Sequence, residues 1–189
     1  VEYTVGTYEE ITAGIFHKLT GALSSQRQQI FSAEINTLPE GLVLDRFYVQ
    51  DGDVSGTPPE GRIAQVSQSL IAALKDPSGK PPTFTRRFQD QQRAAETITH
   101  HLPTRVNIDN STADTFTILA IFAYDRLGLL YNITRTLFEL GLSVSRAKIG
   151  THLDQVVDVF YVTDQSGQKI TDDSKLAEIR RRMLSAIEG

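Results

Sequence analysis

The sequence predicts an α+β protein made of two related small domains, each an antiparallel sheet with helices on one face. The first observation is an internal repeat, because Thr20 and Ala33 align with Thr134 and Ala147 at an offset of 114 residues. The second is that both copies show the same succession of strand and helix patterns. The third is the length of 189 residues, which suits two small domains. Two copies are too few for a solenoid.

The first copy begins with a strand and then shows apolar residues at helical spacing. Ile15, Leu19 and Leu23 define the buried stripe of that helix. Two strands follow around the turn-forming residues 38–41, and a loop rich in glycine and proline leads to a second amphipathic helix. The predicted elements are a strand at 1–8, a helix at 13–23, strands at 30–37 and 41–50, a loop at 51–61 and a helix at 63–74.

The segment between the copies has no counterpart elsewhere in the chain. It opens with Asp76-Pro77-Ser78-Gly79-Lys80-Pro81-Pro82, a composition typical of linkers. Residues 89–99 are compatible with a short helix that has a thin apolar face. We therefore interpret residues 76–103 as a linker.

The second copy is preceded by a short strand and repeats the pattern of the first. Asp125 is predicted to be the N-cap of its first helix, and Gly141 the glycine that ends it. Asp45 and Asp158 occupy matching strand positions, and we expect both on the solvated face. The predicted elements are strands at 105–109 and 116–124, a helix at 127–140, strands at 142–151 and 155–163, and a helix at 172–187.

Each copy thus reads strand, helix, strand, strand, helix, which is the order of a ferredoxin-like fold that lacks one strand. Residues 105–109 are the predicted fourth strand of the second copy. The equivalent strand of the first copy would precede Val1, so we expect the chain to be a piece of a longer protein. The predicted domains are 1–75 and 104–189.

Composition excludes several classes of function. The net charge is −4, and no segment has the basic excess of a nucleic-acid binder. The chain has no cysteine, which excludes disulfides and thiolate metal sites, and its four histidines are too dispersed to predict a metal site. No apolar run approaches membrane-spanning length. We expect a cytoplasmic protein that binds neither nucleic acid nor membrane.

The residues Tyr124-Asp125-Arg126-Leu127-Gly128-Leu129-Leu130 form the most informative motif, a glycine-bearing turn between a strand and a helix. Such a turn directs helix amides towards a small anion. Together with Leu140-Gly141-Leu142 and the later Asp158-Val159-Phe160-Tyr161-Val162-Thr163-Asp164, the motif resembles the ACT domain, a small amino-acid-sensing module.

The resemblance extends over essentially the whole chain. The chain is similar to the carboxy-terminal tandem ACT region of bacterial bifunctional PII uridylyltransferase/uridylyl-removing enzymes. The segments that carry this similarity are Arg105-Val106-Asn107-Ile108-Asp109-Asn110 in the second copy and Leu44-Asp45-Arg46-Phe47-Tyr48-Val49-Gln50-Asp51 in the first. This implies a regulatory region that senses glutamine and controls nitrogen signalling through the PII protein. It implies no catalytic residue or cofactor in this chain, and Mg and UTP in other domains of the parent enzyme. A homodimer through ACT sheets or helices is a further expectation.

The predicted site follows from the turn and the resemblance. Leu127 stands where the family usually has proline, and Ile11 and Thr12 replace Asp125 and Arg126 in the first copy. The predicted ligand-binding residues are Asp125, Arg126, Leu127, Gly128, Leu129, Leu130, Asn132, Ser143 and Val144. The predicted second site consists of Ala13, Gly14 and Ile15.

Three other functions remain open from the sequence. A stand-alone ACT-repeat sensor, or the regulatory domain of another amino-acid enzyme, would use the same turn. An acylphosphatase-like hydrolase would need a phosphate cradle, for which only Arg126 and Asn132 are candidates. An RNA-recognition module would need basic charge and a glycine in the strand at 155–163, and neither is present.

Overall fold

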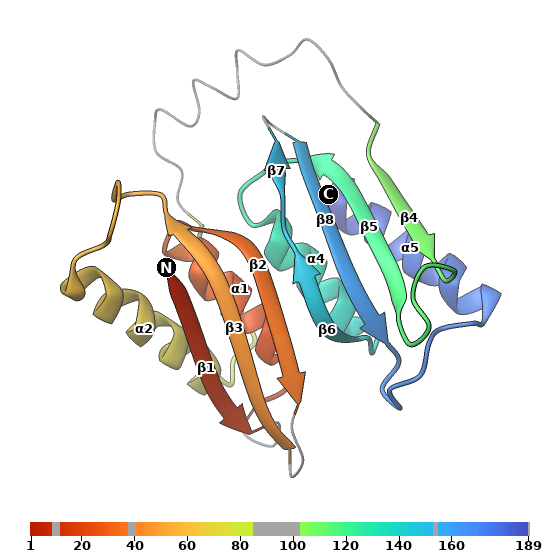
Figure 1. The fold of residues 1–189 in the computed structure, drawn as a ribbon, viewed down its shortest axis with the longest axis horizontal. Coiled ribbons are helices and arrows are strands. Elements are labelled where there is room, and N and C mark those ends of the chain that lie inside the picture. The colour runs from red at the N-terminus through yellow and green to blue at the C-terminus, as the bar shows by residue number, and fades with distance from the viewer. Residues whose placement is uncertain (9–11, 38–40, 85–102, 153–154, 189) are drawn as a thin grey trace.

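A single antiparallel sheet runs through the whole molecule (Figure 1). The computed structural model describes residues 1–8, 12–37, 41–84, 103–152 and 155–188. The predicted short helix at 89–99 and most of the turn at 38–41 lie outside these residues. The sheet has the order β1-β3-β2-β6-β8-β5-β4, with β7 paired to β8. The strands are β1 (Glu2–Tyr8), β2 (Gln28–Thr37), β3 (Leu42–Asp51), β4 (Arg105–Asp109), β5 (Thr117–Tyr124), β6 (Ser143–Lys148), β7 (Thr151–His152) and β8 (Gln155–Thr163).

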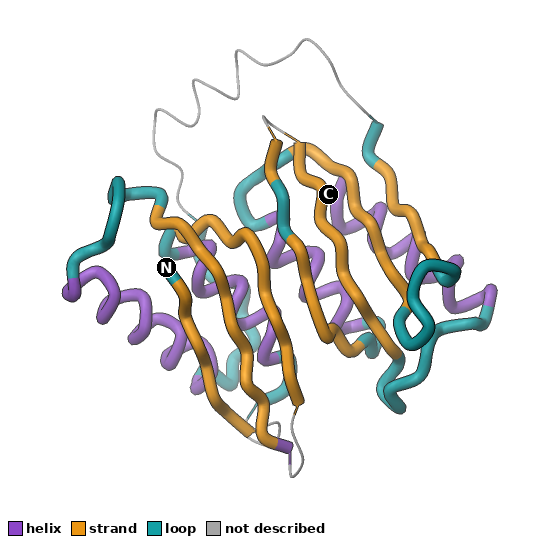
Figure 2. The backbone as a smooth tube through the Cα atoms, viewed as in Figure 1, coloured by secondary structure: helices purple, strands orange, loops and turns teal. Residues whose placement is uncertain are grey.

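The described helices all cover one face of this sheet, and the other face is open (Figures 1 and 2). They are α1 (Ile15–Ser25), α2 (Glu60–Lys75), α4 (Leu129–Glu139) and α5 (Asp173–Glu188). The core lies between the two layers, where Phe47 and Phe160 hold equivalent positions in the repeats and are both fully buried. The predicted α+β class, with helices on one face of antiparallel strands, is confirmed.

The two repeats meet along β2 and β6, which pair antiparallel. Ala33 lies opposite Ala147 in that pairing. Thr20 of α1 contacts Thr134 of α4 on the helix side, with 2.9 Å between their hydroxyl oxygens. Both pairs join the same position of the two repeats, so an approximate two-fold axis passes between them. The sequence left the arrangement of the repeats open, and the structure resolves it as one joint sheet.

Most predicted element boundaries are confirmed within two or three residues. β4 pairs with β5 at the edge of the sheet, as expected for the fourth strand of the second repeat. Gly141 ends α4 with φ of 69°. The Leu142 amide donates to the Leu137 carbonyl at 3.0 Å, and the Gly141 amide to the Phe138 carbonyl at 2.9 Å. These two bonds are those of a Schellman motif, so the predicted glycine stop is confirmed.

The predicted start of α4 is wrong. The helix begins at Leu129 rather than Leu127, and its N-cap is Gly128 rather than Asp125. Gly128 adopts a left-handed conformation with φ of 79°, which glycine reaches without steric cost. The backbone itself therefore turns into the helix here, so a capping carboxylate is not needed.

Candidate ligand-binding site

The two strand-to-helix turns have the same backbone geometry. Gly14 precedes α1 with φ of 70°, and Gly128 precedes α4 with φ of 79°. Neither helix receives a side-chain hydrogen bond from its N-cap residue within the described part of the chain. The first amides of a helix need partners from outside the helix, and a small anion can supply them.

The turn at Gly128 is less open than the sequence suggested. The Leu129 amide, expected to be available to a ligand, donates to the Arg126 carbonyl at 3.0 Å. The ring of Phe84, from the linker, lies so close that a Cβ added to Gly128 would be 2.7 Å from it. Phe84 also contacts Tyr131, with 5.8 Å between ring centroids. A ligand carboxylate at this turn must therefore displace Phe84 or bind beside it.

Arg126 is anchored within its own repeat. Its Nη2 donates to the Ala186 carbonyl in the last turn of α5 at 2.8 Å. Its Nε is buried and has no hydrogen-bond partner among the described residues. The guanidinium thus ties the turn to the end of α5, where carbonyls attract cations.

The other predicted residues of the turn differ in exposure. Asp125 is exposed, and Leu127 is 36% exposed. Gly128 is buried and Leu129 is 2% exposed, so only the backbone of these two can serve a ligand. Leu130 and Asn132 are half-buried on the first turn of α4.

The turn at Gly14 is covered by the ring of His17, which also contacts an aromatic ring of the other repeat. A Cβ on Gly14 would lie 2.0 Å from Cε1 of His17, so the imidazole occupies that space. The His17 ring lies 5.0 Å from the ring of Phe138, near the end of α4. Ala13 is exposed and Ile15 is buried. The first-repeat turn therefore faces the C-terminal end of the other repeat's helix.

Ser143 and Val144 do not lie beside the turn at Gly128. They open β6 after α4, whose 11 residues span about 16 Å at 1.5 Å per residue. The pairing Ser32 to Lys148 and Glu34 to Arg146, continued along both strands, brings Ser143 towards Thr37. Thr37 lies at the end of the sheet that carries the turn at Gly14. In Figure 1 the start of β6 and the end of β2 lie at the same end.

Each end of the junction between the repeats is therefore composite. One end combines the turn at Gly14 with the C-terminal end of α4 and the start of β6. The other end combines the turn at Gly128 with the C-terminal end of α1 and the start of β2. The sequence grouped Ser143 and Val144 with the wrong turn, because antiparallel pairing of β2 and β6 exchanges their neighbours.

Two buried carboxylates lie on the helix-facing side of the sheet. Asp45 and Asp158 are each 1% exposed, so the expectation that they lie on the solvated face is wrong. Burial raises the pKa of Asp45 to about 7, and neither of its oxygens has a hydrogen-bond partner among the described residues. Burial also raises the pKa of Asp158 to about 8, although the Gly150 amide donates to it and opposes the rise; the charge of Asp125 adds to it.

The period of the strands could have revealed these buried residues. Asp45 is two residues from both Val43 and Phe47, which are buried, so the two-residue period of a strand places all three on the same inward face. Phe84, His17 and Phe138 were also missed, and no local pattern identifies them, because each is defined by a contact with a distant segment.

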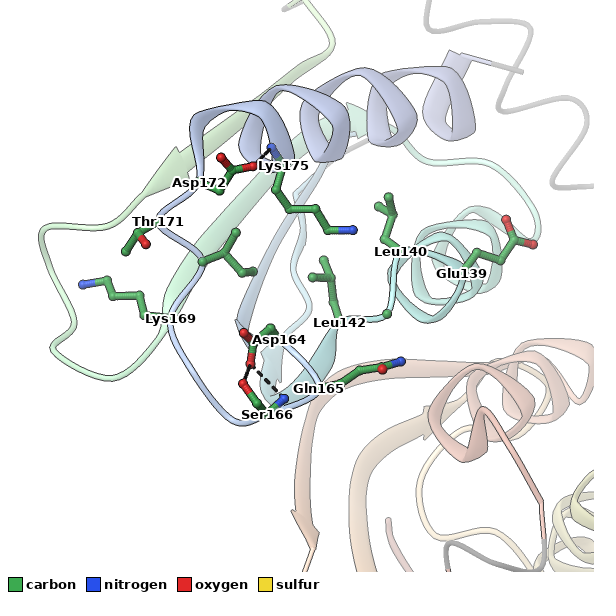
Figure 3. Close-up of a pocket in the computed structure, with 12 residues that line it drawn as sticks. Glu139, Leu140, Leu142, Asp164, Gln165, Ser166, Lys169, Thr171, Asp172 and Lys175 are labelled. Atoms are coloured by element: carbon green, nitrogen blue, oxygen red, sulfur yellow. Dashed lines mark hydrogen bonds between the residues drawn. The ribbon is translucent and has the colours of Figure 1, made fainter.

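Two cavities lie outside the predicted residues. One, of about 680 Å³, lies between the end of α4 and the segment leading into α5 (Figure 3). Asp164 accepts from Ser166 there, and the Lys175 amide donates to Asp172 at 2.8 Å, which caps α5. The other, of about 470 Å³, lies between α1, α2 and the linker. No predicted ligand-binding residue lines either cavity.

No group of three or more potential metal ligands occurs among the described residues. None of the helices formed by the described residues is both long and apolar enough to cross a membrane.

Comparison with known protein families identifies the class of domain to which the second repeat belongs. Residues 105–188 match the family model "ACR9-like, ACT-like domain". With the strand and helix order described above, these residues form an ACT-like domain. A crystal structure of an unknown protein from Galdieria sulphuraria aligns over 99% of this chain and 90% of its own, with a TM-score of 0.30 and 12% identity, too low to define a shared fold.

The particular relatives are bifunctional uridylyltransferase/uridylyl-removing enzymes. The chain is 39% identical over 175 residues to that of Azospirillum brasilense, and 37% identical over 178 residues to that of Gluconobacter oxydans. Each match covers 92% of this chain and 18% of the relative. The resemblance read from the sequence is thereby confirmed, and the chain spans about a fifth of the length of these enzymes.

Proposed function

We propose that this chain is the amino-acid-sensing regulatory region of a bifunctional uridylyltransferase/uridylyl-removing enzyme, with glutamine as its effector. The observation that carries the proposal is the composite junction, where the turn of one repeat and the start of the other repeat's junction strand, β2 or β6, lie at the same end of the sheet. A ligand bound there contacts both repeats at once.

The chemistry of each end suits an α-amino acid. A carboxylate is stabilised by the uncapped start of α1 or α4, because helix N-termini carry partial positive charge. At the second turn, the exposed carboxylate of Asp125 can accept from the ligand's ammonium group. Asn132, one turn into α4, can pair with a side-chain amide, which favours glutamine over glutamate.

Regulation follows from the position of the ligand across the junction. An effector changes a conformational equilibrium only through different affinities for the two states. A ligand that bridges the repeats favours arrangements in which both halves of its site are in place. A coupling of about 1–3 kcal/mol would be typical. In the parent enzyme this coupling would change the balance between attaching UMP to the PII signalling protein and removing it. Mg and UTP would bind in other domains of that enzyme, which we expect to be cytoplasmic.

Calorimetric titration of the chain tests the proposal. We expect saturable heat with glutamine and at least tenfold weaker binding of glutamate. Loss of one charge-assisted or amide contact is expected to cost about 1.4 kcal/mol of binding free energy, which corresponds to a tenfold loss of affinity. Asn132→Ala should weaken glutamine binding, whereas Asn107→Ala, on the open face of β4, should leave it unchanged. If no amino acid produces heat, the chain is not a sensor.

A further inference from the structure

The cavity of about 470 Å³ between α1, α2 and the linker has the size of a small-molecule site. Its walls come from three segments: the outer side of α1, the C-terminal half of α2, and linker residues 76–83. Tyr131 of α4 completes the lining, so both repeats contribute to it. None of the predicted amino-acid contacts lies in this cavity.

The charged groups of the lining favour an anion. Lys18 and Lys80 are its cations, and Asp76 is the only acidic residue among the described residues that line it. Lys18 is half-buried, and its Nζ donates to the Thr12 hydroxyl and to the Asp76 carbonyl. An ammonium group has three donors, so these two bonds leave one for a ligand. Lys80 is exposed at the rim.

Asp76 is already engaged by its own turn. Its two carboxylate oxygens accept from the Ser78 amide at 2.8 Å and from the Ser78 hydroxyl at 2.9 Å. The Lys80 amide donates in turn to the Ser78 hydroxyl at 3.3 Å. These bonds fix the linker where it turns away from α2, so the acidic group shapes the rim and holds Lys80 in place.

The remaining polar groups are neutral donors and acceptors. Burial lowers the pKa of His17 to about 4, and nearby Arg135 and Lys18 contribute, so its ring is uncharged at neutral pH. Ser25, Ser69 and Thr83 also line the cavity. The Ser25 hydroxyl already donates to the Ala22 carbonyl at 2.8 Å, so Ser69 and Thr83 are the hydroxyl donors considered for a ligand. Such groups suit the oxygen-rich body of a phosphorylated or polycarboxylic metabolite.

We propose that this cavity binds a small organic polyanion, with Lys18 and Lys80 holding its phosphate or carboxylate groups. Such a ligand joins α1 to the linker. Pro82 of the linker packs against Gly21 of α1, where a Cβ added to the glycine would be 3.0 Å from the proline ring. Two residues later, the ring of Phe84 lies against Gly128. Lys18 also holds Thr12, next to the turn at Gly14. Occupancy of the cavity is thereby connected to both turns.

Titration calorimetry of the whole chain tests this site with two probes. Pyrophosphate represents a phosphate ligand, and citrate represents a carboxylate ligand. We expect saturable binding of at least one, and Lys18→Gln and Lys80→Gln should each weaken it about tenfold or more, because each removes a charge-assisted hydrogen bond. Lys148→Gln is the matched control, since Lys148 is exposed on β6, on the open face of the sheet.

A second readout follows the linker. The chain has no tryptophan and six tyrosines, so Phe84→Trp provides a single tryptophan at the turn, which can be excited selectively at wavelengths that tyrosine does not absorb. The bound probe should change its emission, and Lys80→Gln in the same background should abolish that change at the same probe concentration. Failure of both probes to bind at millimolar concentration, or equal weakening by Lys148→Gln, would refute the site. Because the probes carry no amino group, these outcomes are independent of glutamine binding.

Discussion

The hydroxyl oxygens of Thr20 and Thr134 lie 2.9 Å apart, and the two residues are the same position of the two repeats. Both are buried, at 0% and 2% exposure. Each hydroxyl oxygen also lies within hydrogen-bond distance of a carbonyl of its own helix, His17 for Thr20 and Leu130 for Thr134. A hydroxyl has one proton, so one threonine donates across the junction while the other donates to its own carbonyl and accepts. The contact therefore joins α1 to α4 where the approximate two-fold axis passes between them.

Replacing one of these threonines should lower the free energy of unfolding by more than half of the loss that results from replacing both. Thr20→Val leaves the Thr134 hydroxyl without its partner across the junction, and the expected loss is about 1 kcal/mol of unfolding free energy. In Thr20→Val/Thr134→Val the two methyl groups pack together, so the losses should not add. Urea denaturation measures Thr20→Val, Thr134→Val and the double variant. Thr136→Val, whose hydroxyl bonds Asn132 in the same helix, is the control, and strict additivity would contradict the coupling.

Substitution of Gly128 should be more harmful than substitution of an equally left-handed glycine elsewhere. Gly128→Ala combines strain of about 1–2 kcal/mol with displacement of the Phe84 ring, 2.7 Å from the new Cβ. Gly167 has φ of 77° and open space around it, so Gly167→Ala should show the strain alone. Thermal and urea unfolding compare them.

A second substitution separates the two causes. Phe84→Ala in the Gly128→Ala background should recover the part of the loss that comes from the clash, while leaving the strain. Equal stabilities of Gly128→Ala and Gly167→Ala would show that Phe84 does not restrict the turn.

Asp45 should make stability depend on pH. Its pKa is raised by burial to about 7, whereas an unfolded aspartate ionises near pH 4. Between pH 4 and pH 7 the Asp45 carboxyl is ionised in the unfolded chain but protonated in the folded chain. The contribution of Asp45 to the free energy of unfolding therefore falls as the pH rises, and it becomes constant above about pH 7. Asp45→Asn removes this dependence.

The stability of Asp45→Asn relative to the unchanged chain should therefore rise between pH 4 and pH 8, by an amount on the order of a few kcal/mol. Urea unfolding across that range measures it. The exposed Asp114→Asn serves as control. A difference that stays constant with pH would show that Asp45 ionises as freely in the folded state.

Among the ion pairs of the described residues, Arg62–Asp51 should be the most costly to break. Arg62 Nε lies 2.7 Å from Asp51 Oδ2, and the side chains are 13% and 1% exposed. Gln28 also donates to Asp51 at 2.7 Å. Arg62→Leu leaves a buried carboxylate without its cation, at an expected cost of about 3–5 kcal/mol.

An exposed pair offers the comparison. Arg135 and Glu139 form an i,i+4 pair with side chains about 40% exposed, and Arg135→Leu should cost less than about 1 kcal/mol. Chemical denaturation distinguishes the two variants. If they lose the same stability, the Asp51 carboxylate is solvated or paired in another way when Arg62 is absent.

The sequence determined the order and nature of the elements. Helical stripes such as Ile15, Leu19 and Leu23, and the stop at Gly141, are local signals, because each depends on residues within one turn or one strand. The repeat at an offset of 114 then carried the assignment from one half to the other. For the same reason the glycine turn, and its resemblance to ACT domains, could be recognised from the residues themselves.

Tertiary structure alone decided which residues share a site. The pairing of Ala33 with Ala147 joins strands that are distant in sequence, and no local pattern encodes its direction. That direction moves Ser143 to the turn of the other repeat. The contact of Phe84 with Gly128 likewise depends on the path of the linker across the helices. Local periodicity specifies which face of an element is buried, whereas the neighbours it meets are selected by packing of the whole chain.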